Sequence, residues 1–290
     1  MSKNVVVFGA AGQLGVELVQ VLKVRGYSVH PFNRASVDIT NLSLLEQTLA
    51  PLDPQVLINA AAYNQVDVAE EEPQAAYSSN ALGVRNLAVA CRQLDALLVH
   101  FSTDYVFDGK LGRPYVEDDR PHPLGAYAVS KLAGELYAQA YLDNPLIIRT
   151  SGVFGPGALR TPRGNFVELM LRLAQSGQPI RVVEDHVASP AYAPALAART
   201  VDIMETSHRG LFHIGGGEAI SWFDFARKIF EASGLNPELR PTNEREYRTA
   251  ARRPKFSALA NARLAECGFA PMPPLDEALT DYMEERARYK

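Results

Sequence analysis

The first half of the chain alternates short apolar runs with stretches whose apolar residues recur at helical spacing. Strands are expected at residues 5–8, 27–32, 56–59, 97–101 and 146–149, and helices at residues 14–22 and 42–49. Each strand is apolar on both faces, which is typical of parallel strands covered by helices. The pattern therefore predicts an α/β fold with a doubly wound parallel sheet of Rossmann type.

Beyond Thr150 the pattern is less regular, and loops rich in glycine and proline separate its segments. Helices are expected near residues 166–176 and 195–204, followed by a strand at residues 211–214 and a helix that Ser221 caps. We expect residues 1–150 to form a dinucleotide-binding domain and residues 151–290 to form mainly a smaller substrate-binding lobe. Some segments of this lobe are expected to return to the main sheet, so that the two parts are partly interleaved.

The bulk composition narrows the classes of function. The 290 residues are 47% hydrophobic and 21% charged, which is enough for a sizeable core. A formal net charge of -4 argues against a nucleic-acid partner, and no apolar run is long enough to span a membrane. Cys91 and Cys267 have no paired spacing and the six histidines are scattered, so no metal site is expected. Because a secretory signal pattern is also missing, the protein is expected in the cytoplasm.

A glycine motif, Gly9-x-x-Gly12-x-x-Gly15, joins the first expected strand to the first expected helix. One glycine permits the tight turn, one lets the backbone approach a pyrophosphate, and one lets helix and strand pack closely. The helix N-terminus, where Gln13 and Leu14 lie, supplies N–H groups and a positive dipole end for the phosphates. The motif and its context predict a dinucleotide cofactor.

The end of the second strand distinguishes the two nicotinamide cofactors. Asn33 and Arg34 stand there, with no carboxylate until Asp38. An arginine accommodates the 2′-phosphate of NADPH, whereas a carboxylate would bind the ribose hydroxyl of NADH. We therefore favour NADPH and leave NADH open. Arg34 is alternatively a solvated surface residue, and Asp38 and Ile39 are alternatively the edge of the adenine pocket.

Tyr127 and Lys131 lie four residues apart, on one face of an expected helix. An ammonium group near a phenol lowers the phenol pKa and makes the tyrosine a usable general acid. Ser102 and Thr103 follow the fourth strand, at the edge where ligands bind in open parallel sheets. We expect Tyr127, Lys131 and a hydroxyl, Thr103 ahead of Ser102, to be catalytic. Each of these residues is alternatively an ordinary helix or turn residue.

The residues that carry a family resemblance lie at 9–15, 59–62, 66–73, 102–109, 123–135 and 164–166, and near Arg253 and Pro274. With them the chain resembles the extended short-chain dehydrogenase/reductases and, within these, the dTDP-4-dehydrorhamnose reductase family. The run Ser-Thr-Asp-Tyr-Val-Phe that begins at Ser102 is the most specific of these motifs. The resemblance extends over nearly the whole chain.

The resemblance implies NAD(P)H-dependent reduction of the C4 ketone of a nucleotide-linked 6-deoxy sugar, as in dTDP-rhamnose biosynthesis. It implies that Tyr127 protonates the developing alkoxide, that Thr103 hydrogen-bonds to it, and that Lys131 supports Tyr127 and bonds the nicotinamide ribose. It also implies that the backbone of Ala60, Ala61 and Ala62 lines the cofactor. The expected substrate contacts are Val66, Ser102, Asp104, Tyr105, Gly152, Asn165 and Arg253. Arg253 is included because a guanidinium group matches phosphate oxygens, and surface charge is its alternative.

One departure concerns the substrate. The family commonly carries a tryptophan that packs against the sugar at the position of Gly152, so a large contact face is missing and the identity of the sugar stays open. Phe154 and Tyr192 are candidates to compensate, and Trp222 is expected in the core or at an interface. Some relatives use a divalent ion at a dimer contact. Here no ligand cluster is expected, and a homodimer is left open.

Two other functions stay open at this point. The first is a nucleotide-sugar epimerase of the same superfamily, which would retain a tightly bound NAD. The second is a non-catalytic protein like the regulatory subunit of methionine adenosyltransferase. Such a protein can keep the same fold and residues equivalent to Thr103, Tyr127 and Lys131.

Overall fold

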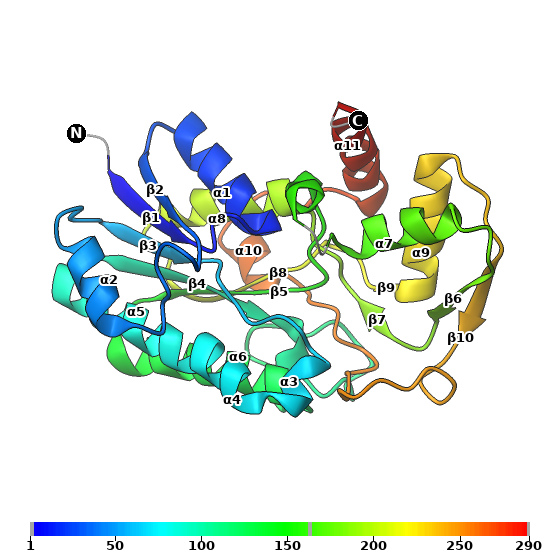
Figure 1. The fold of residues 1–290 in the computed structure, drawn as a ribbon, viewed down its shortest axis with the longest axis horizontal. Helices are drawn as coiled ribbons and strands as arrows, with labels where there is room; N and C mark the ends of the chain where they lie inside the picture. The colour runs from blue at the N-terminus through cyan, green and yellow to red at the C-terminus, as the bar shows by residue number, and fades with distance from the viewer. Residues whose placement is uncertain (1–2, 162–163, 289–290) are drawn as a thin grey trace.

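The computed structural model describes residues 3–161 and 164–288. In this part of the chain the main sheet has six parallel strands in the order β2-β1-β3-β4-β5-β8 (Figure 1). Their bounds are β1 Asn4–Phe8, β2 Ser28–Phe32, β3 Val56–Asn59, β4 Leu97–Thr103, β5 Leu146–Thr150 and β8 Gly210–Ile214. The predicted α/β fold with a parallel sheet is thus confirmed, and β4 extends two residues beyond the predicted strand.

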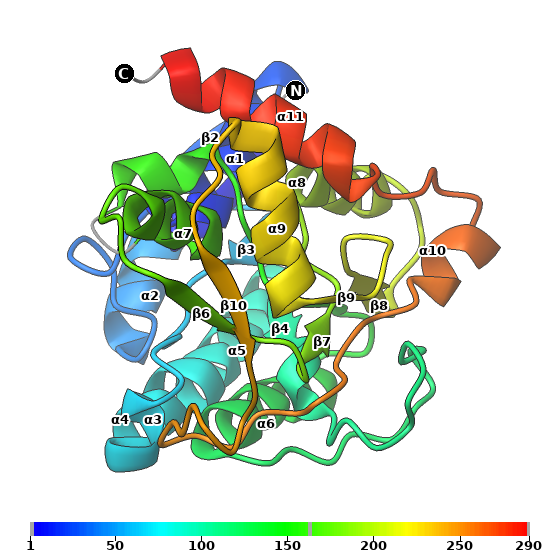
Figure 2. The same ribbon diagram turned by 90° about the vertical axis from the view of Figure 1, so that its right-hand side faces the viewer.

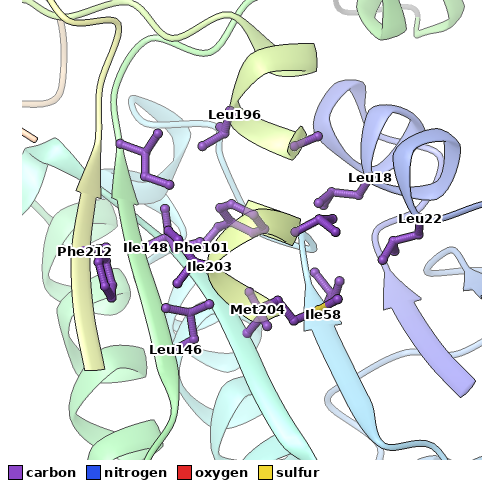
Figure 3. Packing of buried hydrophobic residues seen from close by; sticks show 14 of the residues in the cluster. Leu18, Leu22, Ile58, Phe101, Leu146, Ile148, Leu196, Ile203, Met204 and Phe212 are labelled. Carbon is purple, nitrogen blue, oxygen red and sulfur yellow. The ribbon is translucent and has the colours of Figure 1, made fainter. Parts of the chain in front are cut away.

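Helices cover both faces of the sheet. α1 (Gln13–Val24) and α8 (Ala193–Met204) pack on one face, where Figure 3 shows Leu18, Leu196 and Phe212 within one apolar cluster. The other face is covered by α2 (Leu42–Leu49), α5 (Gly83–Leu94) and α6 (Ala126–Tyr141). Because α8, β8 and the short α10 (Ala262–Glu266) follow residue 150, the second half of the chain contributes directly to this body.

Short helical segments connect the larger elements. Between β3 and α5 they are α3 (Val68–Glu71), α4 (Pro73–Tyr77) and the π-helix η1 (Ser78–Leu82). The 3-10 helices η2 (Asp104–Val106) and η3 (Pro156–Arg160) follow β4 and β5. No helix within residues 3–161 and 164–288 is long and apolar enough to cross a membrane.

A smaller lobe lies beside the sheet, on the right of Figure 1 and facing the viewer in Figure 2. It contains α7 (Phe166–Ala174), α9 (Trp222–Ser233) and α11 (Leu275–Arg288), which share an apolar core. Ser221 caps α9 as predicted, its hydroxyl accepting the Asp224 amide at 3.0 Å. The lobe also holds a parallel pair, β6 (Ile180–Val183) with β10 (Leu239–Thr242), and an antiparallel pair, β7 (Val187–Ala188) with β9 (Ile220–Ser221).

The strand order determines where a ligand can bind. β1 lies between β2 and β3, so the connections that leave the carboxyl ends of β1 and β3 run in opposite directions. In open parallel sheets a crevice opens at such a switch point. The glycine motif follows β1 and Ala60 follows β3, so both border this crevice.

Candidate active site

The three glycines of the motif have different surroundings. Gly9 has φ +73°, and a Cβ atom on it would lie 2.5 Å from the Ala61 amide nitrogen, so the turn requires glycine. A Cβ atom on Gly15 would collide with the Gly9 carbonyl oxygen, which explains the close packing of helix and turn. On Gly12 the nearest neighbour of a Cβ atom is the Gly9 carbonyl oxygen at 3.2 Å. Gly12 is also the N-cap residue of α1. It has no side chain that could accept hydrogen bonds from the first amides of the helix, so these amides can bind a phosphate.

Two cavities adjoin along the crevice. The outer cavity has a volume of about 460 Å³ and the inner cavity about 260 Å³. The outer cavity is lined by the predicted cofactor residues Gly9, Gly12, Asn33, Arg34, Asp38, Ile39, Ala60, Ala61 and Ala62. The inner cavity shares Gly12 and the three alanines and adds Gln13, Leu14, Gly15 and Lys131. The predicted cofactor contacts therefore lie along one crevice, from the end of β2 to the end of β4.

Arg34 stands at the open end of this crevice. Its Nε lies 3.3 Å from Asp38 Oδ2, and its side chain is 81% exposed. The Asp38 carboxylate also accepts the amide and hydroxyl of Thr40, at 2.9 and 2.8 Å. Because an exposed ion pair of this kind is weak, Arg34 can turn to an anion that enters the outer cavity.

The three predicted catalytic residues come together in the inner cavity. Thr103 ends β4, and Tyr127 and Lys131 are one turn apart on α6. Lys131 is 3% exposed, and its Nζ donates to the Phe101 carbonyl oxygen at 2.5 Å. Burial lowers the pKa of Lys131 to about 8, although the Glu135 carboxylate opposes this change.

Asp104, predicted to contact substrate, lines the inner cavity, but its carboxylate is committed to three hydroxyls. It accepts from Thr103 at 3.2 Å, from Ser151 at 2.8 Å and from Ser257 at 2.6 Å. Burial raises the pKa of Asp104 to about 6, and the three hydroxyl groups partly offset this effect. In this arrangement Asp104 positions the Thr103 hydroxyl.

Ser102 is bound on the other side of β4. Its hydroxyl donates to Glu135 of α6, which pairs with Arg149 of β5 through bonds of 3.0 and 2.7 Å. Glu135 and Arg149 are both buried. Ser102, predicted as a substrate contact, also lines the inner cavity, and its hydroxyl belongs to this network. Sequence reasoning missed the ion pair, for which the only signal was the position of Glu135 one turn after Lys131.

Two further predicted substrate contacts line a third cavity of about 340 Å³, the lobe cavity. Arg253 donates to the Asp67 carboxylate at 2.9 and 2.8 Å. The Tyr105 ring lies edge-on to the Tyr127 ring, with centroids 6.2 Å apart. Tyr105 therefore connects the lobe cavity to the catalytic residues.

The remaining predicted contacts have different surroundings. Val66 is half-buried next to Asp67, and Asn165 caps α7 by accepting the Glu168 amide at 2.9 Å. Neither lines any of the three cavities in the described chain. Gly152 does line the inner cavity. Phe154 and Tyr192 pack ring to ring, with centroids 5.5 Å apart, inside the core of the lobe, so neither can replace the contact face missing at Gly152.

Asn80, which sequence reasoning missed, joins the crevice to α6. Its amide group exchanges two hydrogen bonds with the backbone of Tyr63, at 2.8 and 2.9 Å, and donates to Ser130 at 3.0 Å. Ser130 in turn donates to the Tyr127 carbonyl oxygen at 2.7 Å. Asn80 lies in the π-helix η1, a local geometry frequent at functional sites. The surrounding sequence has no signal that distinguishes this segment from an ordinary helix.

The fold also assembles a group that sequence spacing does not reveal. Ligand atoms of Asp185, His186 and Glu244 lie within 4.8 Å of one another. The ammonium group of Lys255 lies 3.2 Å from the Asp185 carboxylate and 3.6 Å from that of Glu244. This ammonium group thus pairs with both carboxylates and offsets one of their two negative charges.

Comparison with known proteins identifies the family. The sequence matches the family described as RmlD substrate binding domain over residues 3–288. Spore coat polysaccharide biosynthesis protein SpsK of Bacillus subtilis is 37% identical over 285 residues, which cover 98% of both chains. A dTDP-4-dehydrorhamnose reductase of Mycolicibacterium smegmatis is 38% identical over 285 residues, covering 97% of this chain and 85% of that protein.

Solved structures agree with the sequence matches. The dTDP-4-dehydrorhamnose reductase of Bacillus anthracis, in complex with NADP, has a TM-score of 0.94 at 37% identity. The alignment covers 98% of this chain and 100% of that one. The resemblance to the extended short-chain dehydrogenase/reductases is confirmed, and the chain belongs to the RmlD substrate binding domain family.

Proposed function

We propose that the protein reduces the C4 ketone of a nucleotide-linked 6-deoxy sugar with NADPH, as dTDP-4-dehydrorhamnose reductases do. The observation that carries this proposal is the crevice with Arg34 at one end and Thr103, Tyr127 and Lys131 at the other. The related reductases, one of them solved with NADP, favour reduction over the epimerase and regulatory-subunit alternatives.

The residues along the crevice fit the cofactor. Gly12 lets the backbone approach the pyrophosphate, and the N-terminus of α1 faces it. Arg34 binds the 2′-phosphate, and Lys131 bonds the nicotinamide ribose. When bound, NADPH supplies the hydride for the carbonyl carbon.

The side chains of the inner cavity supply the proton that the ketone oxygen needs. Tyr127 donates its phenolic proton to the ketone oxygen, so that hydride and proton together convert the ketone into a secondary alcohol. In the free protein the Thr103 hydroxyl donates to Asp104, and when the substrate binds it turns and donates its single proton to the same ketone oxygen instead. Lys131 stabilises the phenolate that remains, because an ammonium group favours a nearby anion.

We also propose that residues 151–290 act mainly as the substrate-binding lobe. Tyr105 and Arg253 line the lobe cavity, and the Arg253 guanidinium group, which pairs with Asp67 in the free protein, binds the diphosphate of the substrate. Val66 and Asn165 act indirectly, Asn165 by fixing the start of α7.

The free thiols Cys91 and Cys267 accord with a cytoplasmic location. Light scattering of the purified protein distinguishes a monomer from a homodimer.

The test follows NADPH oxidation with dTDP-4-dehydrorhamnose as substrate, with NADH in parallel. We expect the protein to oxidise NADPH with this substrate. Any turnover with NADH should be slower. Arg34→Ala should reduce the preference for NADPH without abolishing turnover with NADH. A purified protein that retains stoichiometric NAD and oxidises neither cofactor with any 4-keto nucleotide sugar would contradict the proposal and favour an epimerase.

A further inference from the structure

Trp222, the single tryptophan of the chain, begins α9 next to Gly152. A Cβ atom on Gly152 would lie only 3.1 Å from Cη2 of the indole. Gly152 lines the inner cavity, whereas Trp222 lines the lobe cavity. At this contact, which we call the junction, a wall of the lobe cavity lies against a wall of the inner cavity.

The indole is held in place by its neighbours. The Phe166 ring lies 4.7 Å from it between centroids, at an interplanar angle of 64°, and the Phe225 ring lies 6.0 Å away. The Trp222 amide donates to the His186 carbonyl oxygen at 3.1 Å. An aromatic side chain that is fixed in this way offers a ligand a preorganised face at small entropic cost.

Gly152 makes room for this ring. Its φ of +46° lies in the left-handed region that favours glycine. The same hypothetical Cβ atom would also contact Pro190 Cα at 3.4 Å. A side chain at this position would thus press against the indole and would hold the backbone in a conformation that favours glycine.

We infer that the indole of Trp222 is the surface on which the sugar ring of the substrate rests. This inference depends on the proposed function for the identity of the ligand. With the reacting ketone beside Tyr127 and the nucleotide in the lobe cavity, the sugar must pass the junction that Trp222 and Gly152 border. The C–H face of a pyranose packs well on an aromatic ring, and apolar walls of this kind are typical of ligand sites. Trp222 is thereby a specificity-determining residue that the second lobe supplies.

One test separates substrate affinity from cofactor affinity. Trp222→Ala should raise the KM for dTDP-4-dehydrorhamnose about tenfold, an ordinary effect for removal of a buried aromatic contact, while the Kd for NADPH stays nearly unchanged. Trp222→Phe, which retains a smaller face, should give an intermediate KM. Phe223→Ala is the matched control, because Phe223 is the next residue of α9 and lines none of the three cavities. A KM that does not change in Trp222→Ala would overturn the inference.

A second test uses the unaltered protein. Because Trp222 is the only tryptophan, the tryptophan emission of the protein reports on this residue alone. Saturating dTDP-rhamnose, which carries the sugar but no ketone, should quench this emission more than saturating dTDP does. Equal quenching by the two compounds would overturn the inference. A protein that reduces no 4-keto sugar but shows the sugar-dependent quenching would refute the proposed reaction and support the contact.

Discussion

Lys131 is a buried charged residue, and its burial affects how strongly its ammonium group interacts with Tyr127. It is 3% exposed, and burial lowers its pKa to about 8. The Phe101 carbonyl oxygen accepts from its ammonium group, but a carbonyl carries no full charge. A cation in a poorly screened environment interacts more strongly with a nearby anion than a solvated one does. Lys131 therefore favours a phenolate on Tyr127 more than a surface lysine could.

Replacing Tyr127 with phenylalanine removes the proton donor and keeps the ring. We expect Tyr127→Phe to lower kcat by about 100-fold or more, the usual contribution of general acid catalysis. The Kd for NADPH, measured by cofactor fluorescence, should stay nearly unchanged. Tyr137→Phe is the matched control, since Tyr137 lies on the same helix but outside the inner cavity. If Tyr127→Phe kept most of the wild-type kcat, its role as proton donor would be wrong.

The turn between β1 and α1 shows how an element combines stability with binding. Gly9 combines a left-handed φ of +73° with close contact to the connection after β3, so it belongs to the structure of the turn. Gly12 has an extended backbone, and the nearest neighbour of its hypothetical Cβ atom is 3.2 Å away. Gly9 is thus required for the conformation of the turn, and Gly12 leaves room for the ligand.

Alanine substitutions separate these two roles. Gly9→Ala should lower the free energy of unfolding by about 3 kcal/mol or more, from backbone strain and overpacking together. Gly26→Ala, where φ is +82° but the space is open, should cost only about 1 kcal/mol for strain. Gly12→Ala should retain most of the stability and weaken NADPH binding about tenfold, because the methyl group enters the pyrophosphate site. Urea unfolding and NADPH titration measure both effects. Equal losses of stability in Gly9→Ala and Gly12→Ala would contradict the division of roles.

The Asp104 carboxylate connects segments of the fold that are far apart in the chain. It accepts hydrogen bonds from Thr103 at the end of β4, from Ser151 after β5, and from Ser257 beyond β10. The main sheet and the C-terminal part of the chain therefore meet at one buried group. Burial raises its pKa to about 6, so the ionised form is held at a cost to stability.

This pKa predicts a pH dependence of folding. Asp104 loses its proton near pH 4 when the chain is unfolded and near pH 6 when it is folded. Between these values the folded state binds more protons, so stability should fall as pH rises, by about 3 kcal/mol at most. Asp104→Asn should lack this part of the slope. The free energy of unfolding of both proteins in urea, from pH 4 to 7, measures the difference. Parallel pH profiles for the two proteins would refute the raised pKa.

Local sequence patterns were enough to predict most strands of the main sheet and to select the central residues of the candidate site. The apolar runs predicted β1 to β5, because strands covered on both faces are apolar throughout. Helix α2 has the predicted bounds, Leu42–Leu49. The β6–β10 pair was missed because Arg240 and Pro241 are exposed, so that β10 lacks an apolar pattern. Its partner β6 is also distant in the chain, and the sequence of neither strand indicates that the two pair.

The parallel sheet, the glycine turn and the four-residue spacing of Tyr127 and Lys131 could be predicted, since each depends on residues that are close together in the chain. The contacts of Glu135 with Ser102, of Asp104 with Ser257 and of Trp222 with Gly152 become visible only in the folded chain. Periodicity reports which positions are buried, but not which distant side chain is buried beside them. That choice depends on the order of the strands and on how the second lobe folds back on the sheet.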